Sequence, residues 1–227
     1  MVAEPTPTVW PSSAAATPVA VPVADSATVY LIVKRIVDVV GALLALVLLS
    51  PLMLLAAIAI KLESPGPVFF LQDRVGAGGR RFLFYKFRSM CTEAVAVQGA
   101  IQGMNEVTGP VFKIRQDPRI TPLGRIIRKL SIDELPQLWH VLTGEMSLVG
   151  PRPPIPDEVA RYEPWMLERL SVTPGLTCIW QVSGRSDIPF EDWVRLDIHY
   201  IHHRSIWLDL KILAQTIPAV ITGRGAY

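Results

Sequence analysis

An adjacent pair of carboxylates, Asp133 and Glu134, is the feature of this sequence with the clearest chemical potential. The pair lies in the segment SIDELPQ at residues 131–137, behind a basic run. A carboxylate can attack a phosphoryl group to form an acyl phosphate, or it can bind a metal ion. A helix that begins at this segment would keep Asp133 ionised and would attract a phosphate oxygen. The functional interpretation is therefore phosphate chemistry, with Asp133 as the nucleophile or metal ligand and Glu134 as its neighbour.

The same two acids also have a purely structural interpretation. Ser131 and Glu134 have the spacing of a capping box, which would open a helix running to about Leu142. Asp133 would then be a first-turn acid favoured by the helix dipole. Both interpretations stay open and are compatible, because one side chain can cap the helix while the other faces a substrate.

Basic side chains occur where they could neutralise a diphosphate. Arg128 precedes the acid pair, Arg152 lies on a proline-framed loop, and Arg185 lies on a tight turn. Rigidly held guanidinium groups bind phosphate in bidentate fashion, although a surface salt bridge is an alternative for each arginine. We expect Mg²⁺ as a cofactor, held by few carboxylates together with substrate phosphates. The predicted phosphate-binding residues are Lys86, Arg88, Arg128, Arg152 and Arg185.

Charge is distributed unevenly, although the formal net charge is only +2. Residues 1–33 contain no Lys or Arg, whereas basic residues cluster at 74–88 and 113–129. Such clusters suit anionic lipids or phosphate-bearing substrates, and a solvated basic face is the alternative. Cys91 and Cys178 are too few for a disulfide framework or a zinc site, so we expect two free thiols.

A long uncharged apolar segment at residues 39–60 is expected to enter a membrane. As a continuous helix it would rise ~33 Å, just enough to cross a hydrocarbon core of ~30 Å. Pro51 removes a backbone hydrogen bond and kinks the helix, and Ser50 can satisfy the freed carbonyl. Lys34 and Arg35 precede the segment, more basic residues follow it, and such residues prefer the cytoplasmic side. A simple span and a hairpin that enters and leaves on that side both remain open.

The rest of the sequence predicts a mostly helical α+β fold with a compact catalytic domain. Residues 68–72 and 82–87 are predicted strands, joined into a small hairpin by a glycine-rich loop. Thr121 and Pro122 are typical of the start of a short basic amphipathic helix. Further helices are predicted at residues 165–170, 190–203 and 207–221, the last of them suited to a membrane interface.

The motifs together resemble the bacterial sugar transferases, the monotopic phosphoglycosyl transferases that prime cell-surface glycan synthesis. The resemblance covers about residues 34–227. It rests on KRIVD at 34–38, Ser50-Pro51, SPGP at 64–67, KFRSM at 86–90, DPRIT at 117–121, SIDELPQ at 131–137, SLVGPRP at 147–153 and PGLT at 174–177.

The resemblance implies a re-entrant membrane helix at residues 31–62, kinked at Ser50-Pro51 and flanked by Lys34 and Arg35. A disordered tail at 1–30 would precede this helix. A catalytic domain at 63–227 would follow it, on the cytoplasmic face of the bacterial inner membrane. Members with a similar C-terminal part often carry an extra multi-span N-terminal region; a short tail stands in its place here, so subfamily and donor sugar stay open.

The resemblance also implies a reaction. Asp133 would be the nucleophile, forming a phospho-sugar intermediate with loss of UMP from a UDP-sugar and binding Mg²⁺ with the substrate phosphates. Glu134 would be the second member of the acidic pair. The acceptor would be polyprenol (undecaprenyl) phosphate, and the reaction would prime exopolysaccharide, O-antigen or glycoconjugate synthesis.

Membrane lipids are the other expected partners. A homodimer and downstream glycosyltransferases are candidate partners, and no nucleic acid is expected. A different class of function remains as an alternative: a membrane-tethered scaffold that binds anionic lipid through its basic clusters and catalyses nothing.

Overall fold

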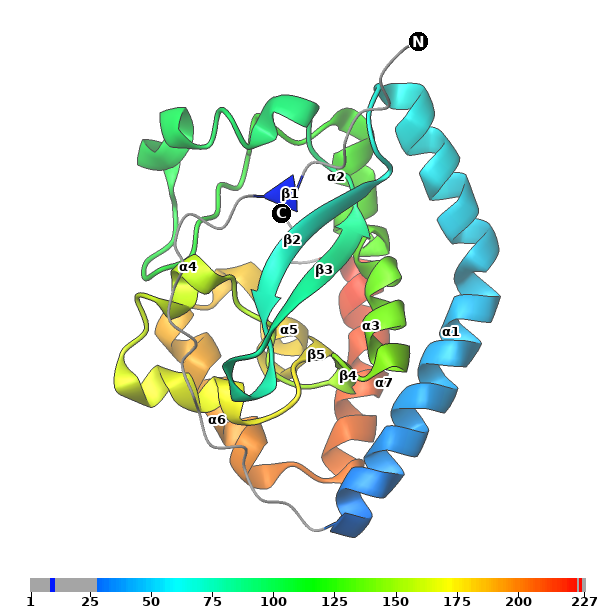
Figure 1. Cartoon of the computed structure of the whole chain (residues 1–227), viewed down its shortest axis with the longest axis vertical. Helices are drawn as coiled ribbons and strands as arrows, with labels where there is room; N and C mark the ends of the chain where they lie inside the picture. The colour runs from blue at the N-terminus through cyan, green and yellow to red at the C-terminus, as the bar shows by residue number, and fades with distance from the viewer. Residues whose placement is uncertain (1–8, 11–27, 224, 226–227) are drawn as a thin grey trace.

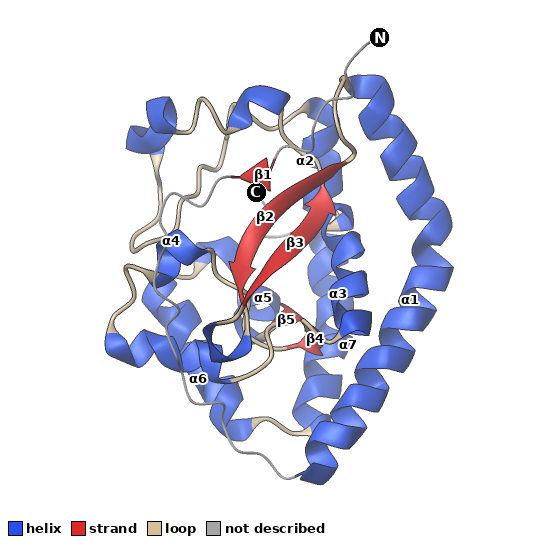
Figure 2. Cartoon of the chain, viewed as in Figure 1, coloured by secondary structure: helices blue, strands red, loops and turns tan. Residues whose placement is uncertain are grey.

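The computed structural model describes residues 9–10, 28–223 and 225. A long N-terminal helix lies along one side of a body made of shorter helices, a β-hairpin and a second small sheet (Figure 1). Helices predominate over strands in the described residues, as the sequence predicted (Figure 2). Most of the predicted disordered tail lies outside the described residues; β1 (Val9–Trp10) and the first turn of α1 are the parts of residues 1–30 that are described.

Helix α1 (Thr28–Glu63) is continuous over 36 residues although Pro51 lies inside it. The amide that Pro51 lacks would have donated to the Val47 carbonyl, and the Ser50 hydroxyl donates to that oxygen instead, at 2.8 Å. This contact confirms the predicted role of Ser50. Because the carbonyl is satisfied in this way, the helix continues past Pro51, and it bows along the body without folding back into two halves (Figure 1).

Strands β2 (Phe69–Val75) and β3 (Arg81–Phe87) form the predicted antiparallel hairpin. Its turn includes Gly78 and Gly79 at φ of 65° and 80°, a conformation that costs glycine little. Strand β1 adds to β2 as a parallel neighbour. The hairpin therefore carries Lys86 on a paired strand, which fixes the direction of its side chain.

A second, parallel sheet was not predicted. It pairs β4 (Ser147–Val149) with β5 (Gly175–Thr177), two segments for which no strand was predicted. A Cβ atom on Gly175 would meet the Gly150 nitrogen at 2.0 Å, so the two backbones can approach this closely only without side chains. This close contact holds the start of the loop that carries Arg152.

The predicted helices are largely confirmed. In α2 (Pro122–Lys129) the Thr121 side chain caps the first turn by accepting from the Gly124 amide at 2.9 Å. Helices α6 (Phe190–His203) and α7 (Ile206–Thr222) match their predicted ranges to within one residue at each end. Residues 165–170 form part of a 3₁₀ helix rather than an α-helix. The other helical segments are α3 (Leu138–Thr143), α4 (Pro156–Val159), α5 (Ile179–Ser183), η1 (Ala77–Gly79), η2 (Thr92–Ala94), η3 (Gly99–Met104), η4 (Ile132–Gln137), η5 (Pro164–Ser171) and η6 (Arg185–Asp187).

The main hydrophobic core joins the hairpin, α3, the small parallel sheet and the C-terminal helices. Phe84, Val141 and Tyr200 are almost fully buried there. A second core surrounds the stacked indoles of Trp180 and Trp193, whose ring centroids lie 4.5 Å apart. The main core directly supports the acid pair, since η4 leads without a break into α3.

The N-terminal part of α1 is bound to the body by its charged residues. Lys34 Nζ lies 2.9 Å from Asp209 Oδ2 in α7 and donates to the Val149 carbonyl at 3.0 Å. The Arg35 guanidinium donates to the Val141 and Leu142 carbonyls at 2.6 and 2.7 Å, at the C-terminal end of α3. A cation at that position satisfies free carbonyls and complements the helix dipole. Both predicted anchor residues therefore bind the protein itself.

The C-terminal end of α1 is bound to the same body. The Arg88 guanidinium donates to the carbonyls of Ile60, Ser64 and Pro65 at 3.3, 2.8 and 2.7 Å. Glu63 accepts a hydrogen bond at 2.8 Å from the first turn of α2. One folded unit thus holds α1 at both ends.

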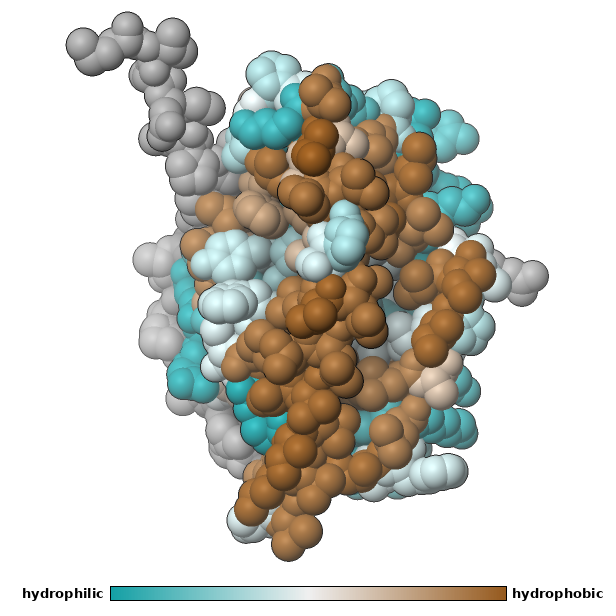
Figure 3. All heavy atoms as spheres, turned by 90° about the vertical axis from the view of Figure 1, so that its right-hand side faces the viewer, coloured by the Kyte–Doolittle hydropathy of each residue, from teal (hydrophilic) through white to brown (hydrophobic). Residues whose placement is uncertain are grey.

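The outward face of α1 is apolar along its length (Figure 3). Only 11% of its most apolar 18-residue window is buried, whereas the core helix of a soluble protein would be mostly buried. Within the described residues, α1 is the one helix long and apolar enough to cross a membrane. Apolar side chains of neighbouring helices are also exposed, namely Ile126, Trp139, Trp207, Ile217 and Ile221. The molecule therefore presents a membrane-compatible surface.

Candidate active site

The turn η4 carries the acid pair, and its entry differs from the prediction. Ser131 is left-handed (φ 54°, ψ 22°), and its side chain makes no capping hydrogen bond. Its amide donates to the Arg128 carbonyl at 3.0 Å and so closes the end of α2, while its own carbonyl accepts from the Glu134 amide at 3.2 Å as η4 begins. The predicted capping box is therefore wrong, because an N-cap residue needs an extended backbone. The Glu134 carboxylate is left available for another partner.

Asp133 is a buried acid with a raised pKa. Its residue surface is 6% exposed, and its carboxylate makes no hydrogen bond with any described residue. Burial, and next the charge of Glu134, raise the pKa of Asp133 to about 6, against the opposing charges of Lys86, Arg128 and Arg152. The carboxylate is mainly ionised at neutral pH, as a nucleophile must be.

Glu134 is bound to an arginine. Arg152 Nη1 donates to Glu134 Oε1 at 2.9 Å. Burial alone would raise the pKa of Glu134, but the charge and hydrogen bond of Arg152 outweigh burial and lower it. The two neighbouring acids thus occupy different electrostatic environments, one without a hydrogen-bond partner and one firmly paired.

Lys86 and Arg128 reach Asp133 from two different elements, β3 and the last turn of α2. Burial, and next the charge of Arg128, lower the pKa of Lys86 to about 7, while Asp133 opposes this shift. Neither side chain forms a hydrogen bond or ion pair with a described residue, although the Lys86 ammonium lies 5.2 Å from the Phe70 ring centroid. Both cations can therefore bind an incoming anion without first breaking an ion pair.

Arg152 and Arg185 approach from the Glu134 side. Arg169 Nη2 donates to the Arg152 carbonyl at 3.3 Å and so supports the loop that carries this side chain. Arg185 sits at φ 53°, donates from Nε to the Gln181 carbonyl at 3.3 Å, and contributes to lowering the pKa of Glu134. The structure thus brings together Lys86, Arg128, Arg152 and Arg185 around the acid pair.

Arg88 does not join this group. Its guanidinium is buried and engaged by the carbonyls at the end of α1. Alternation alone would place Arg88 on the same side as Lys86, but Arg88 lies past the end of β3, where its guanidinium reaches the carbonyls that follow α1. The prediction that Arg88 binds phosphate is corrected to a structural role.

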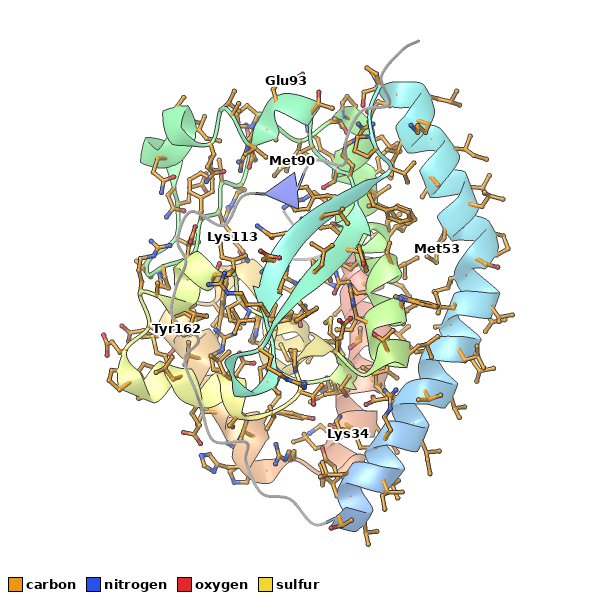
Figure 4. The ribbon with its side chains drawn as sticks, in the orientation of Figure 1. Lys34, Met53, Met90, Glu93, Lys113 and Tyr162 are labelled. Atoms are coloured by element: carbon orange, nitrogen blue, oxygen red, sulfur yellow. The ribbon has the colours of Figure 1, made fainter. Side chains whose placement is uncertain are left out.

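Two further cations were not singled out from the sequence. Lys113 Nζ lies 4.2 Å from the Trp193 ring centroid, and burial, then Arg152 and Arg128, lower the pKa of Lys113 to about 7. Figure 4 shows Lys113 on the loop facing the hairpin. Arg74 is buried and donates to the Pro153 carbonyl at 2.9 Å, which supports the Arg152 loop from the hairpin. Lys113 belongs to the basic cluster at 113–129 and Arg74 to the one at 74–88. Nothing in the spacing of either cluster indicated that these two side chains would lie near the acid pair or its supporting loop.

The side chains available as ligands determine whether a metal ion fits this site. Among residues 9–10, 28–223 and 225, no group of three or more His, Cys, Asp or Glu side chains could hold a metal ion. Mg²⁺, however, is commonly held by one or two carboxylates plus substrate phosphates and waters. Asp133 fits that mode because its carboxylate has no hydrogen-bond partner among the described residues, whereas Glu134 is paired with Arg152.

Comparison with known proteins gives a consistent result. The family model described as "Bacterial sugar transferase" matches residues 29–223. Galactosyl transferase CpsE of Streptococcus agalactiae is 46% identical over 87% of this chain and 44% of its own length. The exopolysaccharide production protein ExoY of Sinorhizobium fredii is 42% identical over 86% of this chain and 88% of its own length.

A third relative has a more explicit name. The UDP-N-acetylgalactosamine-undecaprenyl-phosphate N-acetylgalactosaminephosphotransferase of Aeromonas hydrophila is 44% identical over 87% of this chain and 46% of its own length. The chain thus spans less than half of two of these relatives and most of the third. The named sugars differ between the relatives, so overall similarity does not select a donor.

Proposed function

Because the chain belongs to the bacterial sugar transferase family, we propose that it transfers a sugar 1-phosphate from a UDP-sugar to polyprenol phosphate, releasing UMP. The product would be a polyprenyl diphospho-sugar, the primer of an exopolysaccharide, O-antigen or related glycoconjugate. The observation that carries this proposal is a buried carboxylate without a hydrogen-bonded partner among the described residues, surrounded by Lys86, Arg128 and Arg152. A substrate with two adjacent phosphates matches that charge.

The proposed reaction has two steps. An Asp133 carboxylate oxygen attacks the phosphorus that bears the sugar, and the bond from that phosphorus to the bridging oxygen breaks. UMP leaves with the electron pair, and the sugar phosphate stays on Asp133 as an acyl phosphate. A phosphate oxygen of the lipid acceptor then attacks the same phosphorus, forms the diphosphate and restores the carboxylate.

The cations around Asp133 would stabilise the negative charge on the phosphoryl oxygens and on the departing UMP during the first step. Lys86 and Arg128 would bind the phosphoryl oxygens under attack, since both flank Asp133 without hydrogen-bonded partners among the described residues. Arg152 would hold Glu134 in place while its remaining N–H groups face the substrate. Arg185 would add charge on the same side. Mg²⁺, held by Asp133 and the substrate phosphates, would supply further charge neutralisation.

The direct test is release of UMP from a panel of UDP-sugars by detergent-solubilised protein with Mg²⁺ and undecaprenyl phosphate. Release with one sugar would establish the activity and identify the donor. If folded protein released UMP from none of the sugars, and bound anionic vesicles in a salt-sensitive manner, the tethered scaffold would be the better description.

The attachment of both ends of α1 to one body supports a placement in which both ends lie on the same side of the membrane, although the helix bows and does not form a hairpin. If α1 crossed the bilayer, Lys34 and Arg88 would lie on opposite sides, yet both are bonded to the same folded unit. We place that unit on the cytoplasmic face of the inner membrane, where cations near the membrane prefer to lie.

This placement predicts that both ends of α1 are accessible from the same side. In a Cys91→Ser background, Thr28→Cys and Lys61→Cys should both react with an impermeant maleimide added to inside-out vesicles. Both positions are exposed, whereas the remaining native thiol, Cys178, is buried. Neither should react in right-side-out vesicles until detergent is added. Labelling from opposite sides would establish a true span.

A further inference from the structure

A hollow that is partly open to solvent lies between the hairpin and residues 88–95. Its walls are mainly carbon, contributed by Pro67, Phe69, Phe70, Met90 and Val95. Figure 4 shows Met90 beside the hairpin, on the side away from α6. No step of the proposed reaction so far requires this hollow.

One wall of the hollow carries charge that also faces the nucleophile. Lys86 lines the hollow, and its ammonium lies 5.2 Å from the ring centroid of Phe70, another lining residue. The same ammonium opposes the rise in pKa of Asp133, so it lies within electrostatic reach of that carboxylate. A phosphate bound at Lys86 would therefore lie between the hollow and Asp133.

A second wall of the hollow lies next to the C-terminal end of α1. Pro67 lines the hollow four residues after the end of α1, and Arg88, also a lining residue, is bonded to the Ser64 and Pro65 carbonyls. The apolar outer face of α1 extends to Leu62, which is 83% exposed. Phe69 in the hollow wall is 45% exposed, and its ring stacks on Phe87, which packs in one apolar cluster with Ile60 of α1. An apolar chain could thus pass from the lipid phase along this surface into the hollow.

We propose that this hollow binds the isoprenoid units nearest the phosphate of the lipid acceptor, with that phosphate at Lys86. The proposal rests on the proposed function and adds a location for the second substrate. Carbon-lined walls suit an isoprenoid, which makes no hydrogen bonds, better than a nucleobase, whose polar edge would lose them. The acceptor phosphate would then approach Asp133 from the hairpin side.

A native thiol allows the binding to be measured without catalysis. Cys91 lines the hollow and is partly exposed, whereas Cys178 is buried and burial raises its thiol pKa well above the usual range. Alkylation of the full chain in nanodiscs should therefore report Cys91 alone. Geranyl phosphate should slow this alkylation at least fivefold, while inorganic phosphate and UMP should not.

Each outcome of the alkylation experiment has a distinct meaning. Failure of geranyl phosphate to protect Cys91 would overturn the proposal, and equal protection by UMP would make the hollow a nucleotide site. Protection by inorganic phosphate alone would reduce it to a simple anion site. Because no turnover is needed, protection can be observed even if the chain releases no UMP, so this result and the proposed function fail separately.

A matched pair of variants tests the same site in turnover. Val95→Phe should fill the hollow and raise the KM for undecaprenyl phosphate about tenfold. UMP release in the absence of acceptor, which reports the first step, should be unchanged. Val97→Phe adds the same bulk to an exposed neighbour that does not line the hollow and should behave like the parent chain. Loss of acceptor-free UMP release in folded Val95→Phe, or an unchanged KM, would contradict the proposal.

Discussion

Replacing Asp133 with asparagine should lower turnover at least ~10⁴-fold and abolish acceptor-free UMP release, as removal of a nucleophile does in other covalent enzymes. The amide has nearly the volume of the carboxylate but cannot form the acyl phosphate. The fold should persist, because Asp133 makes no hydrogen bond with a described residue that the variant would lose. UMP quantified after mixing with the donor identified from the panel would measure both quantities.

Two matched variants sharpen this result. Glu134→Gln keeps an acceptor for Arg152 but removes the charge of the acid pair's second member, so it should reduce turnover while retaining some acceptor-free UMP release. Asp187→Asn removes a carboxylate that is 57% exposed and should leave both rates unchanged. Turnover by Asp133→Asn above about one hundredth of the parent rate would refute covalent catalysis by this residue.

Replacing Arg169 with methionine should cause a large loss of stability for a single substitution. Arg169 and Asp197 are 4% and 0% exposed in their side chains and are joined at 2.8 Å. The variant would leave Asp197 buried without its cation, which typically costs about 3–5 kcal/mol. For a chain of this size the loss corresponds to about 10 °C in Tm, measurable by thermal unfolding in detergent.

The double variant Arg169→Met/Asp197→Leu separates charge burial from lost packing. Removing both charges of a buried pair is often nearly neutral, so the second change should recover at least half of the lost Tm. Recovery should be incomplete, because Arg169 also donates to the Tyr162 hydroxyl at 2.7 Å and to the Arg152 carbonyl. If Arg169→Met alone changed Tm by less than about 2 °C, the buried pair would not contribute as described.

The sequence predicted best the features that depend on neighbouring residues. The hairpin follows from apolar and aromatic runs on both sides of a glycine cluster, and the start of α2 follows from Thr121 and Pro122. The structure also brings Lys86, Arg128 and Arg152 around Asp133, as the sequence predicted, and their roles in a reaction stay predictions. The capping box failed although its spacing was correct. Spacing does not specify backbone conformation, and Ser131 adopts a left-handed one.

The features that the sequence did not predict depend on contacts between distant segments. The parallel pairing of β4 with β5 requires close contact between Gly150 and Gly175, which are far apart in the chain, and no local pattern encodes it. Lys113 comes near the acid pair because the 105–113 loop is closed by Asn105, whose side chain bonds to Val107, Val111 and Lys113. Arg88 looked like Lys86 in sequence, and only the position of the end of α1 distinguishes them.

The ion pair between Lys34 and Asp209 imposes an order on biogenesis. Its partners are 175 residues apart, and a ribosome adds about 5–20 residues per second. Helix α1 is therefore synthesised roughly 10–35 s before the aspartate that fixes its N-terminal part exists. During that interval the helix lacks this partner, and α7 can complete the attachment only after Asp209 has been synthesised. The ion pair between Lys34 and Asp209 is therefore a late step of folding, in which α7 binds a helix that was synthesised well before it.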